Sequence, residues 1–216
     1  MPGDTVALAS VSGPIEVRLA AEQASQATFD VSVRPLSNVP STESKSQAAA
    51  IRSALAPSLI LTKNPRTLIQ LVVQILSPSP TCKHSDSQLA AMINASTLSL
   101  LNAGSVPMRG VVCAVAVGKS EADNTELLID PHEDAKITQG GCFAFMITDG
   151  AGVESNSTAV WTNWTSRQGT FDESELLSAR EVARNAVVDV YKAMKRSFLP
   201  DEKLESEDAD DDKMEI

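Results

Sequence analysis

The run TLIQLVVQIL, residues 67–76, is aliphatic and largely apolar on both faces. Such a run is typical of a central strand that is covered on both sides. The loop at 77–87 leads into QLAAMINASTLSLLNAG, whose apolar spacing predicts a helix from about 86 to 103, with Gly104 as its C-cap. A buried strand that passes through a loop into a buried helix predicts a fold of class α/β.

Elements of the same two kinds are predicted along the rest of the chain. Strands are expected at residues 4–12 (ending at a Gly13-Pro14 break), 27–34, 111–117, 126–130, 141–148 and 153–164, the last two joined by a hairpin turn. One helix is expected at 44–60, ended or kinked by Pro57, and a long one after Asp172, with Glu175 at its third position. This order predicts α/β or α+β, with mixed sheets packed with helices.

The net charge of −10 is concentrated at one end of the chain. Residues 200–216 hold nine acidic residues and two lysines, which leaves only −3 for residues 1–199. A segment this charged and this poor in apolar residues is expected to be a disordered acidic tail. One domain is therefore predicted over 1–199, and its nearly neutral body has room for a local basic face.

Nothing in the sequence indicates secretion or a membrane partner. No apolar run approaches about 18 residues, and no basic start is followed by an apolar stretch. The three cysteines, Cys82, Cys113 and Cys142, form no pairing pattern. A cytosolic or nuclear protein is expected.

The loop after the central strand carries Cys82, Lys83, His84 and Asp86. These residue types admit a metal site, a nucleophile with its base, an anion cradle or a simple connection. A metal site is not expected, because the ligands come from one short loop and no C-x-x-C spacing occurs. A Cys–His nucleophile is disfavoured by the i,i+2 spacing. No cofactor is expected.

Several stretches resemble, in order, the ribonuclease PH family, and in particular the non-catalytic ring subunits of the eukaryotic RNA exosome. They are GDTVALASVSGPIEV at 3–17, NPRT at 64–67, NAGSVPMRG at 102–110 and LLIDPHED at 127–134. The resemblance covers about residues 3–198 and implies a ribonuclease PH-like fold with two related β–α halves. It also implies that the family's first strand is truncated here, since the chain starts inside the first hairpin.

The resemblance also assigns a role to the loop at 77–87. Active family members carry Gly-Gly-Thr-Arg there, and its amides and arginine hold the attacking phosphate at the helix N-terminus. Here Pro78 and Pro80 lack N–H donors, and Asp86 adds a negative charge. The loop is thus expected to be a degenerate phosphate loop, formed by Thr81, Cys82, Lys83 and His84.

Active relatives also carry an acidic pair and, a few residues later, a further aspartate for metal or proton chemistry. This chain keeps Glu133 and Asp134, but Gln139 and Gly140 stand where the further aspartate is expected. Glu133 and Asp134 are therefore expected to be remnants of a degenerate site, and no catalytic residue and no metal are predicted. From the residues alone, the pair is a solvated turn.

Four basic residues are candidates for contacts to RNA phosphates: Lys45, Arg52, Lys63 and Arg66. The family pattern is basic at the positions of Arg52 and Arg66, which favours a role facing an RNA channel. Without the resemblance, a surface salt bridge explains these residues equally well.

The resemblance implies a structural subunit of a pseudo-hexameric ring. Its partners would be other ribonuclease PH-like chains, cap subunits, a hydrolytic nuclease and single-stranded RNA passing through the channel. The expected processes are rRNA processing and RNA degradation, in nucleus, nucleolus and cytoplasm. Two alternatives stay open: a phosphorolytic 3′→5′ exoribonuclease that uses Asp134 in an atypical site, and a free-standing RNA-binding module.

Overall fold

The computed structural model describes residues 6–36, 39, 41–76, 85–120, 127–131, 136–148, 157–166 and 169–198. The strands are β1 Ala7–Glu16, β2 Thr28–Arg34, β3 Thr67–Ile75, β4 Val111–Ser120, β5 Leu127–Ile129, β6 Ile137–Ile147 and β7 Ser157–Ser166. The helices are α1 Thr42–Leu55, α2 Ser85–Ala103 and α3 Glu173–Phe198, and short 3-10 turns lie at Leu19–Ala21, Ala56–Ser58 and Leu61–Lys63.

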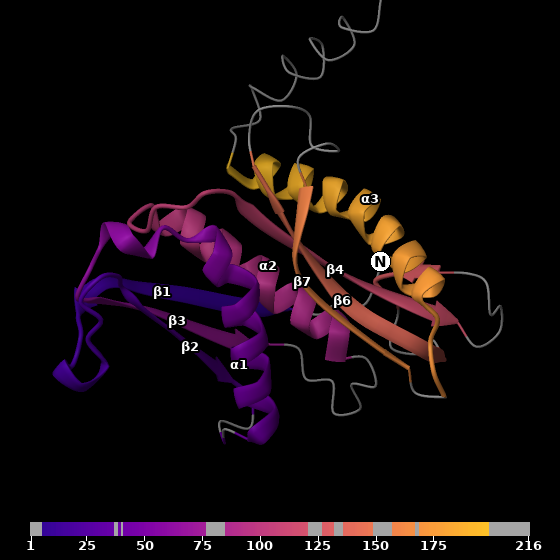
Figure 1. The fold of residues 1–216 in the computed structure, drawn as a ribbon, viewed down its shortest axis with the longest axis horizontal. Helices are drawn as coiled ribbons and strands as arrows, with labels where there is room; N and C mark the ends of the chain where they lie inside the picture. Colours follow the sequence, from indigo (N-terminus) through magenta and orange to yellow (C-terminus); the bar gives the residue numbers. More distant parts are fainter. Residues whose placement is uncertain are drawn as a thin grey trace, which may run out of the picture.

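These elements form two sheets (Figure 1). The first has the order β1-β3-β2, with β1 antiparallel and β2 parallel to β3. The second has the order β5-β4-β6-β7, with every neighbouring pair antiparallel. The central position predicted for residues 67–76 is confirmed, as is the mixed sheet.

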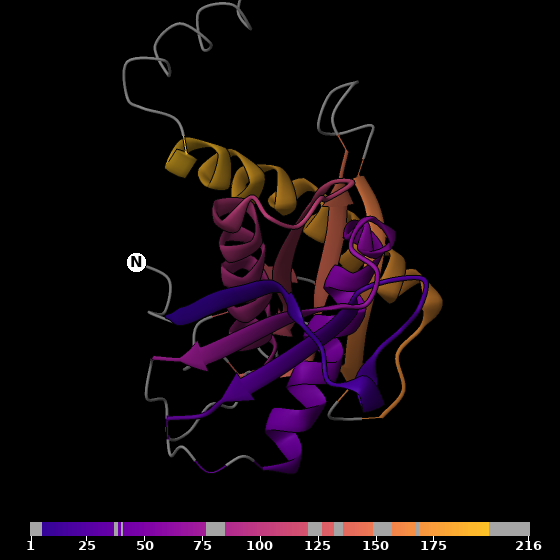
Figure 2. The ribbon, with the colours of Figure 1, turned by 90° about the vertical axis from the view of Figure 1, so that its left-hand side faces the viewer.

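Two hydrophobic clusters fix the order of the layers. The larger joins α1 and α2 to the inner face of the three-stranded sheet and, through Val112, Ala114 and Ala116, to one face of β4. The other packs α3 on the opposite face of β4, through Cys113, Val115 and Val117. The layers therefore run three-stranded sheet, α1 with α2, four-stranded sheet, α3, as Figure 2 shows from the side of the first sheet.

The helix ends follow the sequence signals. The hydroxyl of Ser41 accepts a hydrogen bond from the N–H of Ser44, and α1 ends just before the turn that contains Pro57. Gly104 ends α2 with a φ of 61°. The N–H of Asp172 donates to Oε2 of Glu175, one half of a capping box, which agrees with the cap predicted for the long helix.

The predicted strand end at Gly13-Pro14 is wrong. Strand β1 continues through this pair to Glu16, with a shift of register against β3 between Ser12 and Ile15. Gly13 has a φ of 151°, and a Cβ at this position would lie 2.8 Å from the carbonyl oxygen of Leu68. Glycine thus lets the backbones approach and the strand continue past the proline.

Candidate functional site

Most residues of the predicted degenerate site lie outside the part of the chain that the structure describes. These are Glu133, Asp134, Thr81, Cys82, Lys83 and His84. Their flanks are described: Asp86 lies in the first turn of α2, and Asp130 directly follows β5. Of the two predicted segments, the structure therefore describes only the residues beside them.

The N-terminus of α2 lies against the beginning of β6. A Cβ added to Gly140 would lie 3.6 Å from Oδ2 of Asp86 and 3.4 Å from Cγ2 of Ile137, which is ordinary van der Waals contact. A Cβ would thus fit at Gly140, so its close contacts do not by themselves require a glycine there. The N-terminus of α2 and strand β6 meet in the way that an anion-binding site requires. Here, however, the helix carries the carboxylate of Asp86, and the strand has a glycine, Gly140, opposite it.

Cys142 is fully buried two residues further along β6, on the same face. Burial is the main reason that the pKa of its thiol is raised far above the ordinary value, and the negative charges of Asp86 and Asp130 raise it further. A buried thiol with a raised pKa favours its protonated form, which is the less reactive one. Asp86 and Asp130, 44 positions apart in the sequence, thus both act on the Cys142 thiol.

Gln139 and Gly140 were both candidates for the position of the missing aspartate, and the structure separates them. Successive strand residues face opposite sides of a sheet. Gly140 faces α2, whereas the Gln139 side chain faces α3 and donates from Nε2 to Oε2 of Glu175 at 3.2 Å. Gly140 is thus the position that faces the helix N-terminus.

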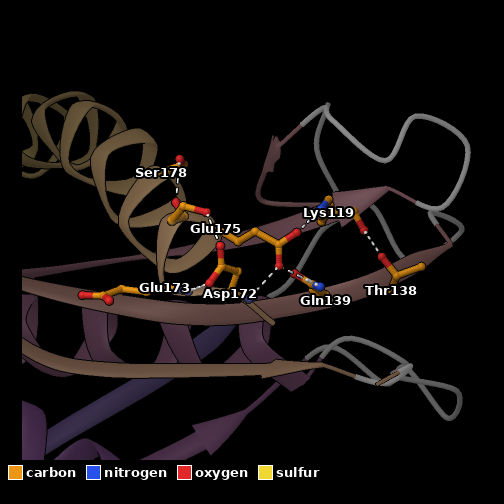
Figure 3. A network of polar contacts seen from close by, with 8 residues as sticks. Lys119, Thr138, Gln139, Asp172, Glu173, Glu175 and Ser178 are labelled. Carbon is orange, nitrogen blue, oxygen red and sulfur yellow. Dashed lines mark hydrogen bonds and ion pairs between the residues drawn. The ribbon is translucent and has the colours of Figure 1, made fainter. Parts of the chain in front are cut away.

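Glu175 ties the start of α3 to the sheet (Figure 3). Its Oε1 accepts a hydrogen bond from Nζ of Lys119 at 2.6 Å, and its Oε2 accepts from the backbone N–H of Asp172 at 3.2 Å. The hydrogen bond from Lys119 is the largest cause of a lowered pKa of Glu175, followed by the bonds from Asp172 and Gln139. The network holds a helix end and two strands together one residue from Gly140.

Replacing Glu175 by glutamine is expected to lower the melting temperature at pH 7 and to have no effect in strong acid. A carboxylate whose pKa is lowered in the folded state stabilises the fold above its unfolded pKa of about 4.3, and this contribution is lost as pH falls through the folded value. Thermal unfolding between pH 3 and pH 7 measures the difference. Glu173→Gln, the same charge change in the same turn, is the control and is expected to show a smaller pH dependence.

A cavity of about 180 Å³ lies between α2, α3 and the outer edge of β4. Ser87, Asn94 and Asp130 supply its polar lining, and the rest is mostly alanine. The Asn94 side chain is already bonded to the backbone of Ala114, and the N–H of Asp130 donates to the carbonyl of Ala116. The cavity is large enough for a few waters, and the buried hydroxyl of Ser87 in its lining has no hydrogen-bond partner among the described residues.

Within the described ranges, no group of three or more His, Cys, Asp or Glu side chains is placed to hold a metal ion. None of the described helices is both long and apolar enough to span a bilayer.

The four basic candidates do not form one cluster. Lys45 and Arg52, two turns apart on α1, line an open hollow of about 550 Å³ together with Asp30 of β2. Lys63 lies in a 3-10 turn, and Arg66 lies just before β3 with a φ of 61°. Nε of Arg66 is 3.4 Å from Oε1 of Glu22, and the Arg66 side chain is 70% exposed, as a surface salt bridge would be.

Residues 2–105 match the model of the 3′ exoribonuclease family, domain 1, the RNase PH family. This part of the chain is similar to RNase PH domains, in agreement with the resemblance drawn from the sequence. Among similar solved structures is the crystal structure of rice (Oryza sativa) Rrp46, with a TM-score of 0.74 over 90% of this chain and 84% of the rice chain. At 20% identity this likeness establishes the fold, a mixed α/β architecture of two sheets and helices.

Three curated relatives are similar in sequence. The exosome complex component rrp46 of Schizosaccharomyces pombe is 35% identical over 52% of this chain and 47% of its own length. The exosome complex component RRP46 of Saccharomyces cerevisiae is 28% identical over 89% and 85%. The exosome complex exonuclease RRP46 homolog of Arabidopsis thaliana is 32% identical over 67% and 56%. The matched segment thus spans about half of the first and third relatives and most of the second.

Proposed function

We propose that this chain is a structural, non-catalytic subunit of the core ring of the RNA exosome. Support comes from the similarity to RNase PH domains and from relatives whose names place them in the exosome complex. Its partners are other ribonuclease PH-like chains, cap subunits and a hydrolytic nuclease, and its work is rRNA processing and RNA degradation. Its place is the nucleus and nucleolus, and also the cytoplasm.

One arrangement carries the non-catalytic part of the proposal. The strand position that faces the N-terminus of α2 is Gly140, and the nearest charged group on the helix is the carboxylate of Asp86. The family resemblance implies that active relatives hold the attacking phosphate at this helix N-terminus and carry carboxylates in the same site. A carboxylate in the first position repels the phosphate, and a glycine in the second supplies no ligand or base.

The RNA contact we propose is the hollow beside Lys45 and Arg52, because it is where two of the four candidate cations converge. Lysine and arginine side chains neutralise phosphates, and this binding weakens with salt. The carboxylate of Asp30 in the same hollow limits its net charge to about +1, which suits passing contacts rather than tight binding.

The proposal is tested by purifying the tagged chain from its own cells and identifying what co-elutes, with the native mass. We expect a stoichiometric set of related ring chains and a hydrolytic nuclease. In that complex, the double variant Lys45→Glu, Arg52→Glu is expected to assemble normally and to reduce the salt slope of RNA binding by about 1.4, from two lost phosphate contacts.

Lys192→Glu on α3 is the matched control for the RNA test, since it changes charge on an exposed helix away from the hollow. If the salt slope of RNA binding is unchanged in the double variant, Lys45 and Arg52 do not contact RNA. If the purified protein is a lone chain or a homo-oligomer, the proposal that it is a subunit of a ring of related chains is wrong.

The competing function is a phosphorolytic 3′→5′ exoribonuclease that uses Asp134. It requires phosphate-dependent release of nucleoside diphosphates from RNA that Asp134→Ala abolishes. We expect no such release from the chain or from its complex.

A further inference from the structure

The four-stranded sheet has two outer edges, and only one of them is sealed. Strand β7 forms one edge over its whole length, and β4 forms the other, with the short β5 beside its end (Figure 1). An edge strand directs every second N–H and C=O away from its partner strand, and these groups need a partner or water. The two edges can therefore be compared group by group.

Side chains of α2 seal the β4 edge. The amide of Asn94 donates to the carbonyl of Ala114 at 2.8 Å and accepts from its N–H at 2.7 Å. Thr97 donates from Oγ1 to the carbonyl of Val112 at 2.8 Å. The N–H of Asp130 donates to the carbonyl of Ala116 at 2.9 Å, and β5 pairs with the residues beyond it. No strand can be added at this edge.

The same contacts fix the direction of the backbone groups across the sheet. The N–H and C=O of Ala114 point away from β6, toward α2. Ala114 and its partner Ala144 on β6 are therefore a non-hydrogen-bonded pair. The N–H and C=O of Ala144 consequently point the other way, toward β7. Ala144 pairs with Trp161, so Trp161 and the residues two and four beyond it bond to β6. Thr162 and Trp164 consequently turn their N–H and C=O away from the sheet.

Within the described ranges, no residue is seen to block the β7 edge at Thr162 or Trp164. Strand β7, STAVWTNWTS, contains no charged residue and no proline, which are the usual means of protecting an edge. Its one irregularity is a bulge at Val160, which leaves residues 161–166 regular. In the described part of the chain, no group outside the β6–β7 ladder bonds to the backbone of Thr162 or Trp164.

We propose that residues 161–166 accept an edge strand of a neighbouring related chain, which continues the four-stranded sheet across a subunit boundary. This rests on the proposed ring function. The occupant is a strand because the unpaired groups are backbone N–H and C=O at strand spacing, and only an extended backbone matches them. It comes from a different chain of the ring because a head-to-tail contact between related chains closes a ring, whereas pairing of two β7 edges stops at a dimer.

The test co-expresses the chain with the related ribonuclease PH-like chains of its organism and compares two variants of Thr162, an exposed residue. Thr162→Pro removes an outward N–H and adds a ring at the edge, but keeps the bonds to β6. Thr162→Val changes the side chain and keeps the N–H. We expect the valine variant to assemble like wild type and the proline variant to assemble about tenfold less or worse, with both free chains folded.

The possible outcomes distinguish the proposed strand contact from the proposed function as a ring subunit. Equal assembly of all three forms would overturn the strand contact and leave the ring intact. Failure of the wild type to assemble with related chains would overturn both.

If the proline variant does not fold, hydrogen exchange of the Thr162 and Trp164 amides tests whether a strand of another chain pairs with β7. Slow exchange in the complex and fast exchange in the free chain supports the proposal. Fast exchange in both, or slow exchange already in the free chain, overturns it, since in the last case another segment of the same chain covers the edge.

Discussion

Replacing Asn94 by leucine is expected to lower the free energy of unfolding by about 2–6 kcal/mol. The Asn94 amide forms two hydrogen bonds to the backbone of Ala114, a residue only 1% exposed. Leucine has a similar volume but no polar atom, so it leaves a buried N–H and a buried C=O without partners. Each such group costs about 1–3 kcal/mol. Urea unfolding of the two proteins measures the difference.

Asn94→Ala is expected to cost less than Asn94→Leu, although it removes more contacts. The cavity of about 180 Å³ borders Asn94, and a water needs only about 30 Å³. Water can therefore reach the Ala114 backbone in the alanine variant but is excluded by leucine. Asn102→Leu, at an exposed position of the same helix, is the control and is expected to stay within about 0.5 kcal/mol of wild type. An alanine variant as unstable as the leucine variant would show that water does not replace the amide.

The sealing of β4 shows what sequence periodicity can and cannot predict. The spacing of apolar residues was enough to predict α2 and its cap, because burial of one helix face determines where leucine, isoleucine and methionine recur. The same periodicity treats Asn94 and Thr97 as polar interruptions. Asn94 and Thr97 hydrogen-bond to the backbone of β4, so their role depends on which strand packs beside the helix. A local sequence pattern carries no information about this tertiary contact.

The tryptophans give a second case. Their spacing of three predicts opposite faces of a strand, and the structure confirms it: Trp161 packs toward α1, and Trp164 packs against Phe143 with ring centroids 5.8 Å apart. The burial of Trp164, at 8% exposed, follows from α3 covering that face. A strand pattern specifies the alternation but does not say which face a distant helix will cover.

The candidate site was predictable in position and only partly in detail. The strand–loop–helix pattern places a helix N-terminus beside a sheet, and Asp86 lies there. The sequence left both Gln139 and Gly140 as candidates for the missing aspartate, because a shift of one residue changes the face. Only the surroundings of each position resolve this: Gln139 bonds to Glu175, and a Cβ added at Gly140 would contact Asp86.

Restoring the carboxylate, as Gly140→Asp, is expected to destabilise the protein at pH 7 by about 1–3 kcal/mol relative to Gly140→Asn. The Cβ fits without a clash, so the two variants share their packing and differ in charge. The new carboxylate would lie beside that of Asp86. Two negative charges this close repel each other, so it is unfavourable for both carboxyl groups to be ionised at once. The pKa of the pair is raised above its unfolded value, so the deficit is absent below about pH 4 and grows as pH rises.

Divalent cations distinguish repulsion between carboxylates from any other cause of this deficit. Paired carboxylates bind Mg²⁺ or Mn²⁺, which favours the doubly charged form. Thermal unfolding of both variants from pH 4 to pH 8, with and without either cation, is expected to show recovery in Gly140→Asp and none in Gly140→Asn. Equal stability of the two variants at every pH would place Asp86 too far from Gly140 to interact. Recovery with metal but no phosphate-dependent RNA degradation would show that one carboxylate rebuilds the cation site, while the loop at 77–87 still lacks the donors that hold phosphate.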